Sequence, residues 1–132
     1  MSGILLDTHV FVWALAAPDR VPEAAWALLR DPTQQLSLSV ASAWELAIKS
    51  AKGKISLPGG VQAFVSEGCR RTGVTLLGID LAHTAEVEGL PHHHRDPFDR
   101  MLVAQARIEG LELLSFDRAL DRYDVRRALP DQ

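Results

Sequence analysis

The sequence predicts an α/β protein, a three-layer α/β/α sandwich around a central, mostly parallel sheet. Three observations predict this fold class. Short apolar segments alternate along the chain with longer segments of helical pattern. The apolar segments lack the polar–apolar alternation of a strand with one face in water, so both of their faces are expected to be covered. Parallel strands joined through helices require right-handed crossovers, which place helices on both faces of the sheet.

Four elements are predicted in the first half of the chain: a strand over residues 3–6, a helix over 22–30, a strand over 36–40 and a helix over 41–52. The first strand is a short apolar run that Asp7 interrupts at once. Pro22 suits the first turn of a helix, where an N–H group would have no partner inside the helix. Gly53 suits a helix end, because glycine adopts the left-handed backbone conformation without strain.

The second half of the chain continues the alternation. The predicted elements are a helix over residues 60–71, a strand over 74–79, a helix from Asp80 to about 88, a helix over 97–109 that Gly110 ends, a strand over 111–115, a short helix from Arg118 and a strand near Val125. Val61, Phe64 and Val65 recur at helical spacing on one face of the first of these helices. Asp80 is of a residue type preferred at helix N-caps.

Composition suits one domain over residues 1–132, with 47% hydrophobic and 23% charged residues. The net charge of −3 argues mildly against nucleic-acid binding, although carboxylates that bind metal would be neutralised locally. No apolar run approaches the roughly 20 residues needed to cross a bilayer, and the start of the chain lacks a signal-peptide pattern. A single cysteine, Cys69, excludes an internal disulfide and suits the reducing cytoplasm.

Four acidic residues far apart in the sequence are predicted at one edge of the sheet. Asp7 and Asp117 each follow a predicted strand directly, and Glu45 and Asp99 lie in the first turns of predicted helices. In a parallel sheet, the carboxyl ends of the strands and the amino ends of the following helices share an edge, where ligands usually bind. Carboxylates brought together repel unless they share protons or bind a cation. Oxygen ligands suit Mg²⁺ or Mn²⁺, and such ions activate water for attack on a phosphodiester.

Each acid also has a structural interpretation that the residues leave open. The stretch DPFD (96–99) has the pattern of a helix start, with its first aspartate as N-cap and its second facing the helix dipole. The stretch SAWE (42–45) matches a capping box. Asp117 could cap the short helix that follows it, and Asp7 could start a turn.

Four stretches carry a resemblance to a known family, namely ILLDTHVFVW (4–13), SVASAWELAIKSAKGKISLP (39–58), HRDPFDRMLVAQA (94–106) and LELLSFD (111–117). In this order and spacing they resemble the PIN-domain ribonucleases, specifically the VapC-type toxins of bacterial toxin–antitoxin pairs. The resemblance covers essentially the whole chain. Its most specific parts are WELAIK and DPFDRMLVAQA, whereas LLDTH alone would be weak.

The resemblance implies a catalytic metal site made by Asp7, Glu45, Asp99 and Asp117, with Mg²⁺ or Mn²⁺ as cofactor. Asp117 occupies a position that is more variable among relatives. Here SFD stands where many relatives have a threonine-containing TxD, which places Ser115 at the hydroxyl position. Asp96 belongs to the same signature and is expected to remain the helix cap.

The activity that the resemblance implies is that of a metal-dependent endoribonuclease toxin of a type II toxin–antitoxin system, which hydrolyses RNA with activated water. The expected products carry 5′-phosphate and 3′-hydroxyl ends. A cyclic 2′,3′-phosphate product would contradict this mechanism, because it would make the ribose hydroxyl the nucleophile.

Six further residues are candidates for contacts with substrate or for support of the acids: Thr8, Lys49, His94, Arg95, Arg100 and Ser115. Thr8 could orient a water or a phosphate, or could be a plain turn residue. Arg95 and Arg100 flank the third acid and could neutralise RNA phosphates, and Arg100 could instead pair with a carboxylate. Lys49 lies one helical turn after Glu45 and is expected to pair with it rather than with RNA.

The run His92-His93-His94 invites a transition-metal interpretation. Consecutive histidines cannot all point at one ion in regular structure, so a structural or substrate-side role for His94 is favoured. The three tryptophans, Trp13, Trp26 and Trp44, could stack on bases, although packing in the core or an interface is expected for each.

The implied partners are an RNA substrate, a second copy of the chain in a homodimer and a cognate VapB-type antitoxin that blocks the acidic pocket. No membrane partner is expected. Surplus apolar residues between positions 22 and 71, which are Trp26, Leu28, Ile48, Phe64 and Val65, could line an antitoxin groove or belong to the core. The competing hypotheses are a non-catalytic PIN-like module that binds RNA or protein, a metal-dependent nuclease acting on another nucleic acid, and a receiver-like domain.

Overall fold

Four parallel strands form the sheet of the computed structural model, which describes residues 3–129. They are β1 (Gly3–Leu6), β2 (Gln35–Ser39), β3 (Thr75–Leu77) and β4 (Glu112–Leu114), in the spatial order β3-β2-β1-β4. Leu6 at the end of β1 lies beside Leu38 of β2 and Leu114 of β4. Because the strands are parallel, their carboxyl ends meet at one edge of the sheet, as the sequence predicts.

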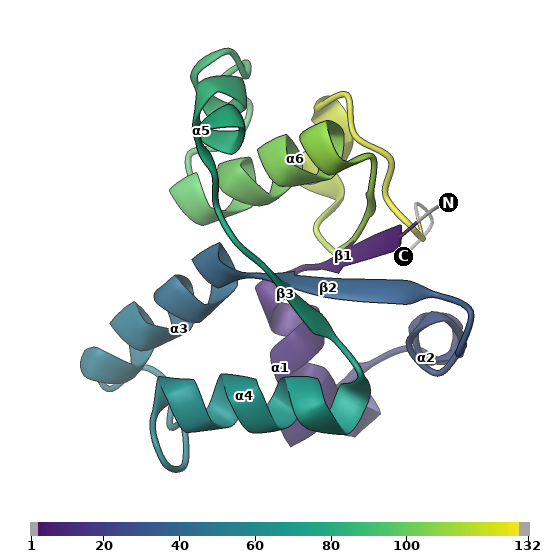
Figure 1. The fold of residues 1–132 in the computed structure, drawn as a ribbon, viewed down its shortest axis with the longest axis vertical. Coiled ribbons are helices and arrows are strands. Elements are labelled where there is room, and N and C mark those ends of the chain that lie inside the picture. Colours follow the sequence, from purple (N-terminus) through teal and green to yellow (C-terminus); the bar gives the residue numbers. More distant parts are fainter. Residues whose placement is uncertain (1–2, 130–132) are drawn as a thin grey trace.

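Helices cover both faces of this sheet (Figure 1). The α-helices are α1 (Thr8–Ala16), α2 (Glu23–Leu29), α3 (Val40–Ala51), α4 (Val61–Thr72), α5 (Leu81–Glu88) and α6 (Pro97–Glu109), and the 3₁₀ turns are η1 (Pro18–Arg20) and η2 (Arg118–Arg122). Helices α5 and α6 lie on one face, and α1 and α4 lie on the other. The expected three-layer α/β/α sandwich is therefore confirmed.

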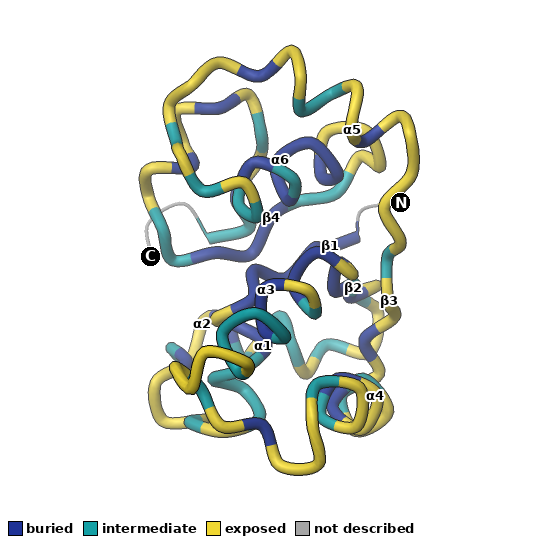
Figure 2. The backbone as a smooth tube through the Cα atoms, turned by 90° about the vertical axis from the view of Figure 1, so that its left-hand side faces the viewer, coloured by how far each residue is buried: buried dark blue, intermediate teal, exposed yellow. Residues whose placement is uncertain are grey.

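Strand β1 joins two hydrophobic cores, one on each face of the sheet. Ile4 and Leu6 belong to a core shared with α1, α3 and α4, whereas Leu5 belongs to a core shared with α6 and η2. Successive side chains of a strand point to opposite faces, and all three are buried. Figure 2 shows deep burial along β1, β4 and α6, in contrast to the exposed α5 and β3.

The helix starts follow local capping chemistry. Asp80 accepts a hydrogen bond from His83 N–H, and the His83 ring accepts one from Asp80 N–H, which makes a reciprocal capping box. Asp96 accepts from Phe98 N–H, as expected of a cap. The predicted capping box at 42–45 is wrong, because the cap of α3 is Ser39, which accepts from Ala41 N–H.

Three elements differ between the sequence prediction and the structure. Helix α1 was not expected, because the stretch THVFVWALA is apolar at nearly every position and shows no polar face from which to recognise a helical period. The strand expected near Val125 is a single bridge between Leu113 and Arg127, flanked by a hydrogen bond from Ala128 N–H to Leu113 O. The predicted strand at 74–79 is shorter in the structure, where β3 covers Thr75–Leu77.

Within residues 3–129, no helix combines the length and the apolar character that crossing a membrane would require.

Candidate metal centre

The four acids lie where the topology predicts them. Asp7 directly follows β1 and is the N-cap residue of α1, and its backbone N–H donates to Leu114 O at the end of β4. Glu45 lies in the second turn of α3 and Asp99 in the first turn of α6, whereas Asp117 is the N-cap of η2. Four separate segments of the chain thus bring carboxylates to one edge of the sheet.

Ser115 links the first and fourth acids. Its hydroxyl donates to Asp7 Oδ2 at 2.7 Å and accepts the backbone N–H of Asp117 at 3.1 Å. Asp7 is buried, and the burial raises the pKa of its carboxyl despite the Ser115 hydrogen bond, which acts in the opposite direction. Ser115 therefore supports the site through Asp7, in keeping with its place at the family's hydroxyl position.

Glu45 is held at both carboxylate oxygens. The Thr8 hydroxyl donates to Oε1 at 2.8 Å, and Lys49 Nζ donates to Oε2 at 2.8 Å. The expected ion pair between Lys49 and Glu45 is therefore confirmed. Thr8 is buried in the first turn of α1, and its hydroxyl also lies 2.8 Å from the Ser42 hydroxyl. Thr8 is not a plain turn residue, since it fixes the carboxylate on a neighbouring helix.

Asp99 shows the electrostatic cost of bringing these groups together. Partial burial and the negative charge of Asp7 raise the pKa of its carboxyl from 3.8 to about 7. Asp96 and Glu45 act in the same direction, and His94 opposes them. Asp99 therefore lies close enough to Asp7 and Glu45 for the charges to repel, and a divalent cation between them would relieve that repulsion.

His94 stands between the third and fourth acids. Its Nε2 lies 3.3 Å from Asp99 Oδ2 and 3.2 Å from Asp117 Oδ2, and these three atoms form one close group. The side chain of Asp117 is 42% exposed, against 18% for Asp99. Asp117 is therefore the most open of the acids, and its Oδ1 accepts the N–H of Ala119 as a cap.

The donor set fits a hard divalent cation. All four acids offer carboxylate oxygens, which Mg²⁺ and Mn²⁺ prefer over nitrogen or sulfur. The only cysteine, Cys69, is on α4 and packs against the core that contains Ile4 and Leu6. Lys49 is the one Lys or Arg side chain ion-paired with the four acids within residues 3–129, so the cluster keeps an excess of negative charge when its carboxyls are ionised.

The prediction that Arg100 contacts RNA phosphates or pairs with a carboxylate is wrong. Its guanidinium is buried and donates to Pro91 O at 2.8 Å, to Val87 O at 3.1 Å and to the Tyr123 hydroxyl at 3.2 Å. Backbone carbonyls at the end of α5 and in the loop after it, together with the Tyr123 hydroxyl, take up these donors. Arg95, by contrast, is exposed beside the site.

Two hollows open from the acidic edge. A groove of about 350 Å³ is lined by Glu45, Ile48, Lys49, Lys52, Lys54, Arg95, Asp96, Pro97 and Phe98. A second hollow of about 260 Å³ is lined by Asp7, His9, Trp13, Phe116 and Asp117. The sequence alone singles out none of Lys52, Lys54, His9 and Phe116, which line these hollows. His9 is part of the LLDTH stretch, but its position could not be predicted because helix α1 was not expected.

The tryptophans divide between packing and exposure. Trp13 stacks on Phe116 with ring centroids 5.9 Å apart. Trp26 lines an apolar pocket of about 210 Å³, in agreement with the packing expected of it. Trp44 is 60% exposed and touches Phe98 edge-on, so it is outside the core, and its packing in an interface stays a prediction.

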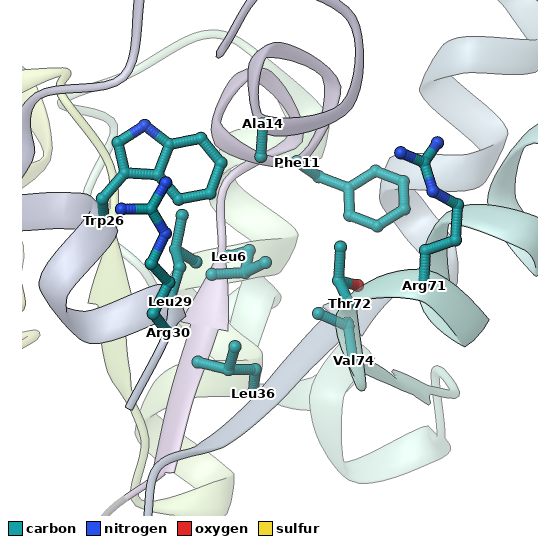
Figure 3. A pocket seen from close by; sticks show the side chains of 10 residues that line it. All are labelled: Leu6, Phe11, Ala14, Trp26, Leu29, Arg30, Leu36, Arg71, Thr72 and Val74. Carbon is teal, nitrogen blue, oxygen red and sulfur yellow. The ribbon is translucent and has the colours of Figure 1, made fainter. Parts of the chain in front are cut away.

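None of the four acids lines the apolar pocket, which includes Leu36 near the start of β2 and Val74 just before β3. In Figure 3, Trp26, Leu29 and Arg30 stand on one side of it and Arg71 and Val74 on the other. The five apolar residues that could line an antitoxin groove or belong to the core divide between these roles, and Leu28 and Phe64 pack against the core. Trp26 lines this pocket, Ile48 lines the groove beside Glu45, and Val65 belongs to the core.

Comparisons with known proteins place these features in context. The sequence pattern of the family described as PIN domain matches residues 4–126. Ribonuclease VapC22 of Mycobacterium tuberculosis (strain ATCC 25618 / H37Rv) is 31% identical over 121 residues, which cover 91% of each chain. Ribonuclease VapC16 of the same strain is 41% identical over 69 residues, and this match spans about half of either chain, 52% of this one and 48% of the relative.

Solved structures share the fold at low sequence identity. VapBC2 from Rickettsia felis, bound to a DNA fragment from its promoter, has a TM-score of 0.69 at 15% identity, with 94% of this chain and 95% of that chain covered. DNA-bound VapBC from Salmonella typhimurium has a TM-score of 0.66 at 18% identity, with 96% of each chain covered. FitAcB from Neisseria gonorrhoeae has a TM-score of 0.62 at 22% identity, covering 96% and 97%.

Proposed function

The chain belongs to the PIN domain family, and from this membership and its acidic edge we propose that it is a Mg²⁺- or Mn²⁺-dependent endoribonuclease, the toxin of a type II toxin–antitoxin system. The observation that carries the proposal is the convergence of four carboxylates from four segments, with the pKa of Asp99 raised to about 7. Such a cluster has little value for folding and a clear use in holding a cation.

In this proposal Asp7, Glu45, Asp99 and Asp117 hold the cation. When bound, the cation would lower the pKa of a water molecule and would neutralise the negative charge that develops on the scissile phosphate. Thr8 and Ser115 fix the carboxylates of Glu45 and Asp7 through hydrogen bonds. Each carboxylate oxygen has two acceptor positions, so these hydrogen bonds leave capacity for the cation.

The groove beside Glu45 supports RNA as the substrate. Lys52, Lys54 and Arg95 are exposed along it, and Lys49 lies at the Glu45 end. Cationic side chains neutralise phosphates and position a nucleic-acid strand without reading its sequence. A strand that places one phosphate at the acids would pass its neighbouring phosphates along these cations.

The partners and the setting are part of the same proposal. Membership of the family, together with the relatives named as VapC ribonucleases, supports a VapB-type antitoxin, a homodimer and a cytoplasmic location. The domain is proposed to span residues 1–132. Light scattering on the purified chain, alone and with the product of a neighbouring antitoxin gene, tests the first two. A chain that stays monomeric and binds no such product would contradict them.

The test of the activity is RNA cleavage with Mg²⁺ or Mn²⁺, with and without chelator, by the wild type and by Asp99→Asn. We expect cleavage that needs metal, leaves 5′-phosphate ends and is lost in a folded Asp99→Asn variant. Equal cleavage by the two proteins would contradict the proposal. RNA binding without cleavage by wild type would favour the non-catalytic alternative, and preference for matched single-stranded DNA would favour a nuclease of another class.

A further inference from the structure

The ring of His94 has an assigned tautomer, because one of its nitrogens faces a group that can only donate. The backbone N–H of Asp96 points at His94 Nδ1 over 3.1 Å. Nδ1 must therefore accept, and it carries no hydrogen. In a neutral imidazole the hydrogen then resides on the other nitrogen, Nε2.

The hydrogen on Nε2 is donated to Asp117, and Asp99 lies beside the same nitrogen at ion-pair distance. Nε2 lies 3.3 Å from Asp99 Oδ2 and 3.2 Å from Asp117 Oδ2. A nitrogen that carries a hydrogen has no lone pair to give to a metal, so His94 in this tautomer is a donor and not a metal ligand. The second oxygen of Asp117, Oδ1, accepts the N–H of Ala119 and keeps one acceptor position for a cation.

We propose that His94 is a positioning residue of the metal centre: its Nε2–H donates to Asp117 Oδ2 and holds that carboxylate beside Asp99, so that both acids face the divalent cation. This inference rests on the proposed function, since it assumes that these carboxylates bind the cation. It also gives the centre an all-oxygen donor set, which favours Mg²⁺ and Mn²⁺ over Zn²⁺.

A buried scaffold fixes the position of His94. Its backbone N–H donates to the Tyr123 hydroxyl at 2.9 Å. Arg100 donates to the same hydroxyl at 3.2 Å and to Pro91 O at 2.8 Å, and both Tyr123 and Arg100 are buried. The loop before α6 is thus anchored on either side of the histidine, so the ring has one place to occupy.

The same arrangement occurs at a second histidine of this chain. His83 Nδ1 accepts the backbone N–H of Asp80 at 3.0 Å, and its Nε2 lies 2.9 Å from Glu109 Oε2. There the ring fastens α5 to α6 and is fully buried. The recurrence shows that a backbone N–H on Nδ1, with a carboxylate on Nε2, is a stable way for this fold to use histidine as a clamp.

The tautomer is tested on the metal-free protein by long-range ¹H–¹⁵N NMR of the histidine rings, with His94→Gln to assign the His94 signals. We expect the hydrogen on Nε2 and an unprotonated Nδ1. A hydrogen on Nδ1 with Nε2 free would overturn the proposal. This measurement needs no metal and no activity, so it stands even if the nuclease proposal fails.

The positioning role is tested by Mn²⁺ binding, measured by electron paramagnetic resonance of the free ion. Loss of a group that hydrogen-bonds to metal ligands weakens metal binding by about 10–100-fold. We therefore expect His94→Ala to weaken Mn²⁺ binding at least about tenfold. His94→Gln, which can place an amide N–H near the carboxylates, should recover part of the loss. His92→Ala, in the exposed neighbour, is the matched control and should bind as wild type does.

Two results would overturn the positioning role. One is His94→Ala binding Mn²⁺ as tightly as wild type, and the other is a pulsed spin-echo signal from a nitrogen bonded directly to Mn²⁺, which would make His94 a ligand. Failure of the wild type itself to bind Mn²⁺ would be a different result. It would overturn the proposed metal-dependent function and, with it, the use of the His94 clamp for a cation.

Discussion

The negative charge of Asp99 is favoured by the helix dipole of α6, but the neighbouring carboxylates repel it when no cation is bound. In the first turn of α6 its charge interacts favourably with the helix dipole, by about 0.3–1 kcal/mol. Burial and the neighbouring carboxylates nevertheless raise its pKa from 3.8 to about 7. A folded-state pKa above the unfolded value means that the folded protein binds the proton more tightly. The metal-free protein therefore loses stability as pH rises from about 4 to about 7.

Because ionised Asp99 destabilises the metal-free protein, we expect Asp99→Asn to stabilise that protein at pH 8. The variant removes a charge that the site repels, and we expect a net gain on the order of 1 kcal/mol after the loss of the dipole interaction. The gain should shrink towards pH 4, where wild-type Asp99 is protonated. Urea unfolding with chelator at both pH values checks this. A variant less stable than wild type at pH 8 would contradict it.

Arg100 is a buried charged residue that stabilises the fold and does not contact the acids of the candidate site. Arg100→Met would remove the donor of Pro91 O and one of the donors to Val87 O and to the Tyr123 hydroxyl. Hydrogen bonds from a charged group contribute about 1.5–3 kcal/mol each, so we expect a loss of about 2–4 kcal/mol in the free energy of unfolding. Arg95→Met, at an exposed position just before α6, is the control. Its unfolding midpoint in urea should be nearly unchanged.

At the scale of elements, a helix could be predicted where its segment has marked ends and a polar face beside an apolar one. Helices α5 and α6 were predicted at both ends, since Asp80 and Asp96 cap their starts and Gly110 ends α6 in the left-handed conformation. Helix α1 was missed because its apolar sequence has no polar face. A strand was expected near Val125 from the residues there, but the structure has only one bridge, between Leu113 and Arg127. The local sequence does not indicate how many residues pair.

Lys52 and Lys54, which follow α3 and line the groove, provide a test of RNA binding. We expect the double variant Lys52→Ala/Lys54→Ala to bind single-stranded RNA more weakly in an Asp99→Asn background, which prevents cleavage. Each lost phosphate contact lowers the salt dependence of binding by about 0.7 in log–log slope. The slope should thus fall by about 1–1.5 units. The control is Arg30→Ala/Arg71→Ala, which removes equal charge beside the apolar pocket. Equal effects of the two double variants would contradict a specific groove.

For the whole molecule, the convergence of the acids was predictable because it follows from topology alone. A parallel sheet places Asp7, Glu45, Asp99 and Asp117 at one edge whatever the local side-chain geometry. The partners of the acids were harder to predict, since they depend on loops. Nothing in the sequence fixes the His94 ring between Asp99 and Asp117, because its place depends on Tyr123 from the far end of the chain.

The same convergence predicts that metal binding stabilises the entire fold. The proposed ligands come from the ends of β1 and β4 and from α3 and α6, so the site cannot survive the separation of these segments. A ligand at 100 times its Kd stabilises the folded state by about 2.7 kcal/mol.

For a chain of this length, that energy corresponds to a rise in Tm of about 8–10 °C. Calorimetry with Mn²⁺ should show this rise for wild type and none for Asp99→Asn. A similar rise in both proteins would mean that Mn²⁺ binds elsewhere. No rise in either, at Mn²⁺ concentrations that support cleavage, would mean that the acids bind cation only together with RNA, whose phosphate then completes the coordination.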